Sequence, residues 1–275
     1  MFLQRVKKLR SQLSWSSYCV LCVVCLINIG CGSSAVYTRK PLQEPEIAEC
    51  VILIHGLGRT YRSMWNMEHT LRDAGYLTVN IDYPSRSKSI EQIARELVPD
   101  AIEQCTINNT EAIHFVTHSM GGIIARTSIR AERPEKLGRV VMLSPPNKGS
   151  KIVDALKDSW YFRWINGPAG QQLSTAPNSL PNTLGPVDYP VGIITGNDPA
   201  FFDIWFTNFI PGINDGKIGV EQTKLEGMTD FMVVAESHTY IMDSNRVQKE
   251  TINFLEHGVF TKISKRSKDR DLGSN

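Results

Sequence analysis

A serine near the middle of the sequence has the surroundings of a catalytic nucleophile. Ser119 lies in the segment Thr117–Gly121 (THSMG), which follows an apolar, β-branched run and precedes a helix-like stretch. A tight turn between a strand and a helix exposes a serine hydroxyl at the helix N-terminus, and small neighbours let the backbone turn sharply. Thr117 replaces the first glycine of the G-x-S-x-G pattern. The alternative is a serine that only caps the helix, because serine is favoured at that position.

A second glycine-rich turn supplies the donors that such a nucleophile needs. The segment His55–Gly58 (HGLG) follows the apolar run Cys50–Ile54. Acyl transfer passes through an oxyanion, which is stabilised by N–H groups aimed at the developing charge. The expected oxyanion hole consists of the backbone N–H groups of Leu57 and of Met120, the residue after the serine. His55 is then a structural histidine beside the site. Taken alone, a glycine-rich turn after a strand is common.

A histidine near the C-terminal end is the expected general base. His238 lies in Ala235–Thr239 (AESHT), after the β-like run Asp230–Val234 and before the last helix-like stretch. This position fits the chain order serine, acid, histidine. We therefore predict that His238 deprotonates Ser119. The other histidines lie in turns or near the ends of expected elements: His55, His69, His114, His118 and His257.

Two aspartates are the main candidates for the acid that orients the histidine. Asp215 lies in Asn214–Lys217 (NDGK), and Asp198 follows the apolar run Val191–Thr195. We favour Asp215, because an Asp-Gly turn before alternating apolar residues places a carboxylate in a loop at a strand edge. Asp198 remains the alternative acid, and Asp203 is a weaker third candidate.

These residues are separated by alternating strand-like and helix-like segments, which is typical of parallel βαβ units. We therefore predict an α/β fold with a mostly parallel sheet of about six strands and helices on both faces. The expected strands are Cys50–Ile54, Leu77–Ile81, Ile113–Thr117, Arg139–Leu143, Val191–Thr195 and Asp230–Val234. The expected helices are Ser63–Ala74, Ile90–Gln104, one from the serine turn to about Ala131, and Asn245–His257.

The chain from about Cys50 to Phe260 resembles the bacterial lipase and esterase branch of the α/β-hydrolase superfamily. The resemblance rests on four ordered segments: HGLG at 55–58, THSMGG at 117–122, SPPNKGS at 144–150 and NDGK at 214–217. It implies the α/β-hydrolase fold, a serine nucleophile, and an oxyanion hole at Leu57 and Met120. It also implies a cap over the site, which we place in the insertion at about 150–188. A long insertion of this kind is often functional.

The expected activity is cleavage of carboxylic esters through the triad Ser119, Asp215 and His238. Aromatic residues in the insertion, such as Trp160, favour lipid-like or apolar acyl groups, although they could equally pack the cap onto the body. A thioesterase or acyltransferase would use the same triad, and a non-catalytic binding protein of this fold is the alternative from another class. We expect no metal and no cofactor.

The N-terminal segment differs in character from the rest of the chain. Basic residues in positions 5–10 precede an uncharged run, Ser11–Thr38, with an apolar centre at Tyr18–Ile29. This pattern favours a secretory signal, a lipoprotein signal or a signal anchor at 1–31, followed by a linker at 32–49. The segment Asn28–Cys31 resembles a lipobox, so Cys31 is the candidate lipidation site. We therefore expect an exported protein that is membrane-associated or periplasmic.

Charge and cysteine content limit the remaining interpretations. The net charge is +2 with interspersed signs, and the tail at 261–275 is basic and poor in apolar residues. This charge distribution gives no sign of a nucleic-acid partner. The expected partners are a small-molecule or lipid ester and a membrane. In the strand order of the superfamily, the strand that begins at Cys50 and the strand that follows Cys105 are neighbours. Both cysteines are therefore expected at the same end of the sheet. These two cysteines are thus the candidates for one disulfide in an exported domain.

Overall fold

The computed structural model describes residues 34–42 and 48–261. The expected signal or anchor segment with Cys31, and nearly all of the basic tail, lie outside the described residues. The described chain forms one sheet of seven strands in the order β1-β3-β2-β4-β5-β6-β7. The strands are β1 (Ala35–Arg39), β2 (Glu49–Ile54), β3 (Leu77–Asp82), β4 (Ala112–His118), β5 (Leu137–Leu143), β6 (Val191–Gly196) and β7 (Asp230–Val234).

The sheet has one strand more than the sequence analysis expected. The additional strand, β1, lies within the segment 32–49 that was expected to be a linker. It pairs with β3 in the antiparallel direction, with Ala35 opposite Asp82 and Arg39 opposite Thr78. Its five residues show little apolar alternation, and tertiary contacts hold it in place. The Arg39 guanidinium lies 2.5 Å from the buried carboxylate of Glu68.

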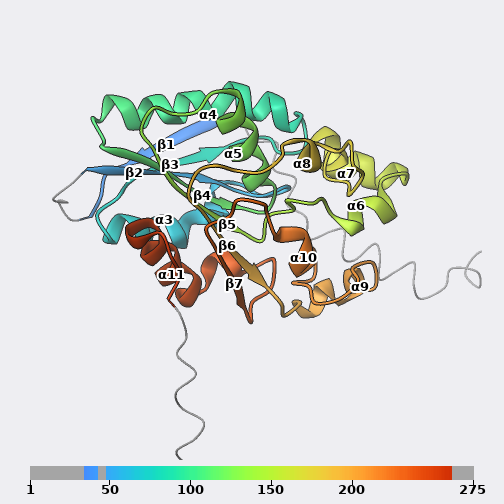
Figure 1. Cartoon of the computed structure of the whole chain (residues 1–275). Helices are drawn as coiled ribbons and strands as arrows, with labels where there is room; N and C mark the ends of the chain where they lie inside the picture. Colours follow the sequence, from blue (N-terminus) through green and yellow to red (C-terminus); the bar gives the residue numbers. More distant parts are fainter. Residues whose placement is uncertain (1–33, 43–47, 262–275) are drawn as a thin grey trace, which may run out of the picture.

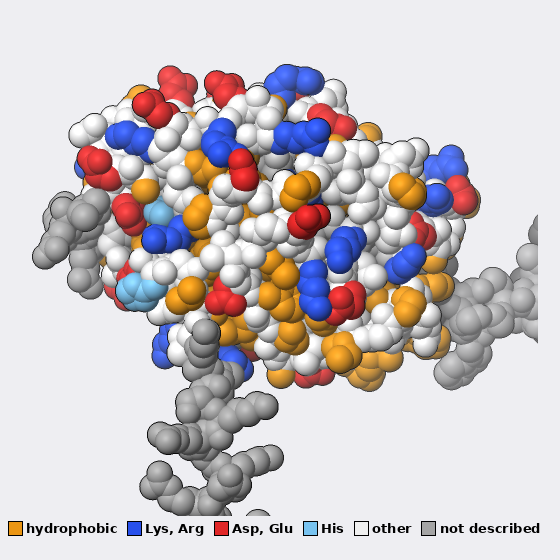
Figure 2. Space-filling model, in the orientation of Figure 1, with side chains coloured by type: hydrophobic (Ala, Val, Ile, Leu, Met, Phe, Trp, Pro, Cys, Tyr) orange, Lys and Arg blue, Asp and Glu red, His pale blue; other side chains and the backbone are white. Residues whose placement is uncertain are grey.

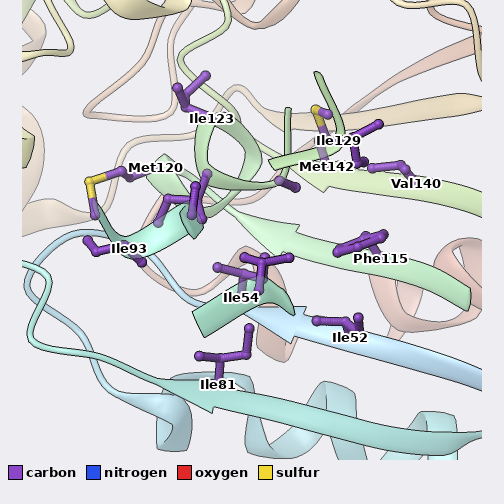
Figure 3. Close-up of a cluster of buried hydrophobic side chains, with 14 of the residues drawn as sticks. Ile52, Ile54, Ile81, Ile93, Phe115, Met120, Ile123, Ile129, Val140 and Met142 are labelled. Carbon is purple, nitrogen blue, oxygen red and sulfur yellow. The ribbon is translucent and has the colours of Figure 1, made fainter. Parts of the chain in front are cut away.

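Helices cover both faces of the sheet (Figure 1). The helices α4 (Ile90–Ile107) and α5 (Met120–Ala131) pack on one face, and α3 (Trp65–Asp73) and α11 (Asn245–His257) pack on the other. Strand β2 shows why two cores form: Ile52 and Ile54 enter one apolar cluster, and Val51 and Leu53 enter the other. Parallel strands buried on both faces read as continuous apolar runs for this reason. Figure 3 shows part of the first cluster, with Phe115 beside Ile52.

The C-terminal ends of the parallel strands all lie at one edge of the sheet, which we call the carboxyl edge. The segments that follow these strands leave the sheet there. Between β5 and β6 lie α6 (Lys151–Leu156), α7 (Trp160–Gln171) and α8 (Leu180–Thr183). Between β6 and β7 lie η2 (Phe201–Asp203), α9 (Ile204–Thr207) and α10 (Val220–Thr223). Short turns of 3-10 helix, η1 (Tyr61–Met64) and η3 (Ile241–Asp243), flank α3 and α11. Figure 1 shows α6, α7, α9 and α10 at the right-hand end of the sheet. Among the helices at 34–42 and 48–261, none has both the length and the apolarity needed to cross a membrane.

A disulfide joins Cys50 of β2 to Cys105 in the last turn of α4, with the two Cα atoms 5.7 Å apart. Strands β2 and β4 are neighbours, and Cys50 lies opposite Ile113 at the start of β4. Helix α4 runs back from the carboxyl edge, which brings Cys105 to the end of the sheet where β2 begins. Both cysteines are fully buried. The bond therefore ties a helix to the strand beneath it at the edge opposite the catalytic loops.

We expect the double variant Cys50→Ala/Cys105→Ala to be less stable by about 2–4 kcal/mol, because the unfolded chain is no longer restricted by a loop of this length. Urea unfolding of the two proteins measures the difference. A reducing agent should lower the stability of the unmodified chain and leave that of the variant unchanged. Equal stabilities under oxidising conditions would contradict the assignment.

Candidate active site

The turn between β4 and α5 holds Ser119 in an unusual backbone conformation. Its φ and ψ angles are 54° and −123°, and its backbone N–H donates to the carbonyl of Leu143 on β5 at 2.8 Å. A positive φ is costly for a residue with a side chain and persists only where the surrounding structure imposes it. Gly121 shows what imposes it here. A Cβ atom on this residue would lie 2.3 Å from the carbonyl oxygen of Ile54, so only glycine lets α5 pack against β2.

Three predicted residues from distant segments form one hydrogen-bonded line. Nε2 of His238 lies 3.0 Å from Oγ of Ser119, and Nδ1 of His238 lies 2.8 Å from Oδ2 of Asp215. The backbone N–H of His238 also donates to the Asp215 carbonyl at 2.9 Å. Asp215 comes from the loop before α10, and His238 comes from the loop after β7. The structure therefore brings together the serine, acid and base positions that the sequence analysis favoured.

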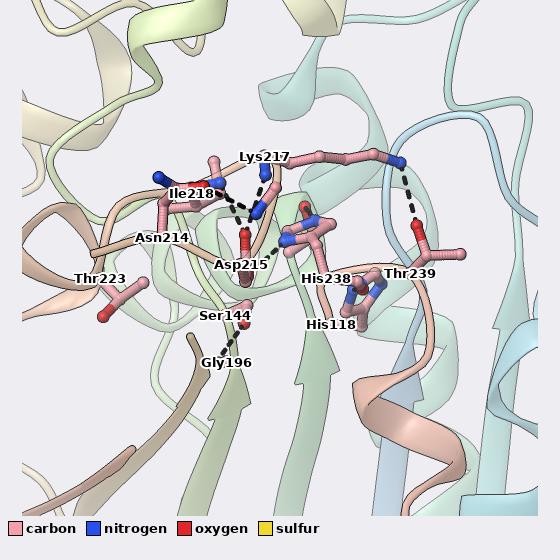
Figure 4. A network of polar contacts seen from close by, with 12 residues as sticks. His118, Ser144, Gly196, Asn214, Asp215, Lys217, Ile218, Thr223, His238 and Thr239 are labelled. Carbon is pink, nitrogen blue, oxygen red and sulfur yellow. Dashed lines mark hydrogen bonds and ion pairs between the residues drawn. The ribbon is translucent and has the colours of Figure 1, made fainter. Parts of the chain in front are cut away.

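The Asp215 carboxylate is fully buried and held by several donors (Figure 4). Its Oδ1 accepts the backbone N–H groups of Lys217 at 3.0 Å and Ile218 at 2.8 Å. Burial alone would raise the pKa of this carboxyl. The charge and hydrogen bond of His238, the Ile218 N–H and the Ser144 hydroxyl outweigh burial and hold the pKa below its ordinary value. The group is thus an anion that faces His238.

The other two aspartates considered from the sequence lie elsewhere. Asp198 is exposed, and its backbone N–H donates to the carbonyl of Glu236 at 3.3 Å. Asp203 is buried, accepts a hydrogen bond from Oγ1 of Thr239 at 3.0 Å, and lies 3.8 Å from Nζ of Lys217. The structure gives neither carboxylate a hydrogen bond to His238.

The loop after β2 lies beside the nucleophile, as the position of Gly56 shows. A Cβ atom on Gly56 would lie 3.1 Å from Cβ of Ser119 and 2.9 Å from Nδ1 of His118. The backbone N–H groups of Leu57 and Met120 have no acceptor among the residues that the structure describes. N–H groups left free beside the nucleophile are what an oxyanion hole requires.

His55 and His118 support the site through the backbone rather than through proton transfer. His55 is buried, its Nδ1 lies 2.9 Å from the carbonyl of Gly56, and its ring stacks on Tyr83 at 3.9 Å. His118 is also buried, and its Nε2 donates to the carbonyl oxygen of His238 at 3.0 Å. His118 thus fixes the backbone of the residue that faces Ser119.

The sequence analysis missed a polar network on the far side of His238. Nζ of Lys217 donates to Oγ1 of Thr239 at 3.3 Å (Figure 4), and the Arg59 guanidinium donates to the Thr239 carbonyl at 2.9 Å. Together with Asp203 these groups hold the loop that carries His238. The only signal in the sequence was that Lys217 lies two positions after Asp215 and that Thr239 directly follows His238. No group of three or more His, Cys, Asp or Glu side chains in residues 34–42 and 48–261 is arranged to hold a metal ion.

The insertion after β5 contributes packing and exposed aromatic rings. Phe162 of α7 is buried in the apolar cluster beneath it, whereas Trp160 and Trp164 of the same helix are largely exposed. A Cβ atom on Gly170 would lie 3.3 Å from Cδ2 of Leu57, so the second half of α7 adjoins the Leu57 loop. Of the two interpretations left open from the sequence, packing applies to Phe162, while the two tryptophans point away from the body.

Comparison with known proteins identifies the family. Residues 51–216 match the model of the alpha/beta hydrolase family, and this span is more than half of the chain. The chain therefore belongs to the alpha/beta hydrolase family. A search of curated proteins found no significant match.

Solved structures of bacterial lipases and esterases share the fold. The mature form of the Bacillus licheniformis lipase BlEst2 matches with a TM-score of 0.65 at 17% identity, over 80% of this chain and 98% of that chain. Est1E from Butyrivibrio proteoclasticus matches with a TM-score of 0.52 at 16% identity, over 80% and 93%. A thermophilic esterase from Thermogutta terrifontis gives 0.51 at 13% identity, over 82% and 93%. At such identities the likeness shows the fold alone.

The buried position of His118 leads to a prediction about acid stability. Burial holds the pKa of its imidazole well below the ordinary value of 6.5, and the nearby charges of His238 and Arg59 lower it further. Below about pH 6.5 the unfolded chain takes up a proton at His118 that the folded chain does not, so the free energy of unfolding falls as the pH falls.

One such proton contributes at most about 1.4 kcal/mol per pH unit. We expect the His118→Asn variant to lose this contribution, so its unfolding free energy should vary less with pH below about 6.5. Urea unfolding at stepped pH compares the two slopes. Identical slopes would show that His118 is not kept neutral by the fold.

Proposed function

We propose that the protein is a serine hydrolase that cleaves carboxylic esters, with lipid-like or apolar acyl groups as the preferred substrates. The observation that carries the proposal is the line of hydrogen bonds from Ser119 through His238 to Asp215. It occurs in a chain of the alpha/beta hydrolase family, and lipases and esterases are among the structures that share its fold.

In the proposed reaction, Nε2 of His238 takes the proton of Ser119 as Oγ attacks the acyl carbon. The Asp215 carboxylate keeps the histidine in the tautomer with its proton on Nδ1 and stabilises the imidazolium that forms. The N–H groups of Leu57 and Met120 hold the oxyanion, each lowering the barrier by about 3 kcal/mol. His238 then protonates the leaving alcohol, and water releases the acid from the acyl-serine by the same steps.

The buried polar surroundings of His238 support this division of roles. Because Asp215 is ionised and desolvated, its attraction to the imidazolium is stronger than it would be in water. The His118 donor and the Thr239 contacts fix the backbone on both sides of the ring, so the histidine does not have to reorganise when Ser119 transfers its proton.

A thioesterase or an acyltransferase would use the same three groups, and only the leaving group or the acceptor would differ. Rates with matched esters, thioesters and amides of graded acyl length rank these substrates. A non-catalytic binding protein is the alternative from another class. It predicts that Ser119 does not react with a fluorophosphonate.

We expect the Ser119→Ala variant to lose ester hydrolysis by about 10⁴-fold or more while remaining folded, because no other group takes over nucleophilic attack. Release of 4-nitrophenol from 4-nitrophenyl butyrate measures the rate, and circular dichroism checks the fold. Undiminished turnover in the purified variant would exclude Ser119 as the nucleophile.

A matched pair of aspartate variants tests the acid in the same assay. Asp215→Asn should reduce the rate by about 10⁴-fold, because an amide favours the wrong histidine tautomer. Asp198→Asn should change it by no more than about threefold, because the exposed carboxylate has no contact with His238. The reverse ranking would move the role to Asp198.

We also propose that the protein is exported and attached to a membrane through its N-terminal segment. Support comes from the basic start, the apolar run at Tyr18–Ile29 and the lipobox-like Asn28–Cys31. Labelling the full chain with a fatty acid should mark the native sequence and not Cys31→Ser. Unlabelled native protein would exclude the lipidated form and leave a cleaved signal or a signal anchor.

A further inference from the structure

Four aromatic side chains at the carboxyl edge are left in contact with solvent. Trp160 and Trp164 of α7 are 77% and 74% exposed, and Phe201 of η2 and Trp205 of α9 are 88% and 72% exposed. We call these four residues the aromatic rim. They are the most exposed large apolar side chains of the described residues. Phe201 and Trp205 lie in one short segment, and exposed apolar side chains that cluster in this way usually mark an interaction surface.

The aromatic rim lies at the same edge of the sheet as the proposed nucleophile. Helix α7 belongs to the insertion after β5, and η2 and α9 follow β6, so both parts extend from the carboxyl ends of strands (Figure 1). The part after β6 also touches the histidine loop. The ring of Phe202 meets that of Tyr240 edge-on at 6.1 Å, and Asp203 bonds Thr239. A surface that binds the part of the rim after β6 would therefore lie close to the loop that carries His238.

The segment from Pro199 to Ile213 presents no charge to solvent. Its single charged residue, Asp203, is 2% exposed, and Thr239 and Lys217 satisfy its carboxylate. The neighbours of the rim in this segment are also apolar and exposed: Ile204, Phe209 and Ile213. Figure 2 shows hydrophobic side chains gathered around the position of α9, at the lower right of the molecule.

This composition fits a lipid surface better than a protein partner. Protein interfaces surround an apolar centre with a polar border that supplies hydrogen bonds. In the segment 199–213, exposed tryptophan and phenylalanine without exposed charge are instead suited to the boundary between lipid headgroups and acyl chains, where Trp is enriched. Trp160 and Trp164 of α7 lie beside the exposed charges of Asp158 and Arg163.

The direction of β1 provides a second argument, which rests on the proposed membrane attachment of the N-terminal segment. Because β1 is antiparallel to β3, its first residue, Ala35, lies opposite Asp82, the last residue of β3. The chain before Ala35 therefore joins the domain at the carboxyl edge. Cys31 lies four positions before Ala35 in the sequence, so their Cα atoms can be at most about 14 Å apart. An anchor at Cys31, or in the apolar run before it, would hold this edge close to a membrane.

We propose that the carboxyl edge docks on a lipid bilayer through the aromatic rim, with Ser119 and the loop that carries His238 on the side that faces the lipid. The substrate class that follows is an ester presented at a lipid surface. Only this last step rests on the proposed hydrolase function, because docking requires no turnover.

The docking test uses the full chain with Ser119→Ala and vesicles of brominated phosphatidylcholine, which quenches tryptophans that reach the acyl chains. We expect tryptophan emission to be quenched. The added pair Phe201→Ser/Ile204→Ser keeps every tryptophan in place and should reduce the quenched fraction by about half, because it removes apolar contact area.

A matched control pair is Ile107→Ser/Val259→Ser. These residues are exposed by 65% and 46%. Ile107 is the last residue of α4 and Val259 lies two positions after α11, both at the opposite edge of the sheet. Quenching should remain as in the parent. Equal quenching in the rim pair and the control pair overturns the proposal. A dimer that forms in the absence of vesicles, depends on Phe201 and is accompanied by no quenching also overturns it, because the rim then binds a second copy.

The catalytic consequence is measured with Ser119 restored. The substrates are dissolved 4-nitrophenyl butyrate and 4-methylumbelliferyl oleate embedded in phosphatidylcholine vesicles. We expect the Phe201→Ser/Ile204→Ser pair to lower the ratio of vesicle to dissolved turnover by about tenfold and to leave butyrate hydrolysis unchanged. An unchanged ratio counts against docking. If the parent hydrolyses neither ester while rim-dependent quenching persists, the hydrolase function fails and docking stands.

Discussion

The turn at Ser119 is the constraint on which the rest of the site depends. Its positive φ is maintained because β4 is fixed between β2 and β5, and because Gly121 allows α5 to approach the carbonyl of Ile54. A larger residue at Gly121 would push the helix away from β2, and the serine would relax out of its strained conformation. The hydroxyl is thus aimed by the packing of a helix on a sheet.

The remaining groups of the site are positioned from the same edge of the sheet. Loops after β2, β4 and β7 bring Leu57, Ser119 and His238 together, because the parallel strands all end at the same edge of the sheet. The acid comes from the long segment between β6 and β7. Its carboxylate is fixed by backbone N–H groups of its own turn, so its position depends on local geometry as well as on His238.

Two features of the fold connect the site with its surroundings. The antiparallel strand β1 brings the N-terminal part of the domain to the catalytic edge, and the Arg39–Glu68 pair ties that strand to α3. At the opposite edge the Cys50–Cys105 disulfide joins α4 to β2. Covalent restraint therefore lies at the amino edge, while the carboxyl edge consists of loops and short helices, the parts of a fold that carry binding and catalysis.

The sequence by itself predicted the six strands from β2 to β7 and the four helices that cover the sheet, and it singled out Ser119 and His238, because local patterns mark turns after apolar runs. It favoured Asp215 over Asp198, but only the tertiary structure separates a buried carboxylate bonded to His238 from an exposed one. Strand β1 escaped detection because a short edge strand is held by distant partners rather than by its own periodicity. Exposure of Trp160 and Trp164, against burial of Phe162, was likewise decided by packing, since all three are aromatic residues of one helix.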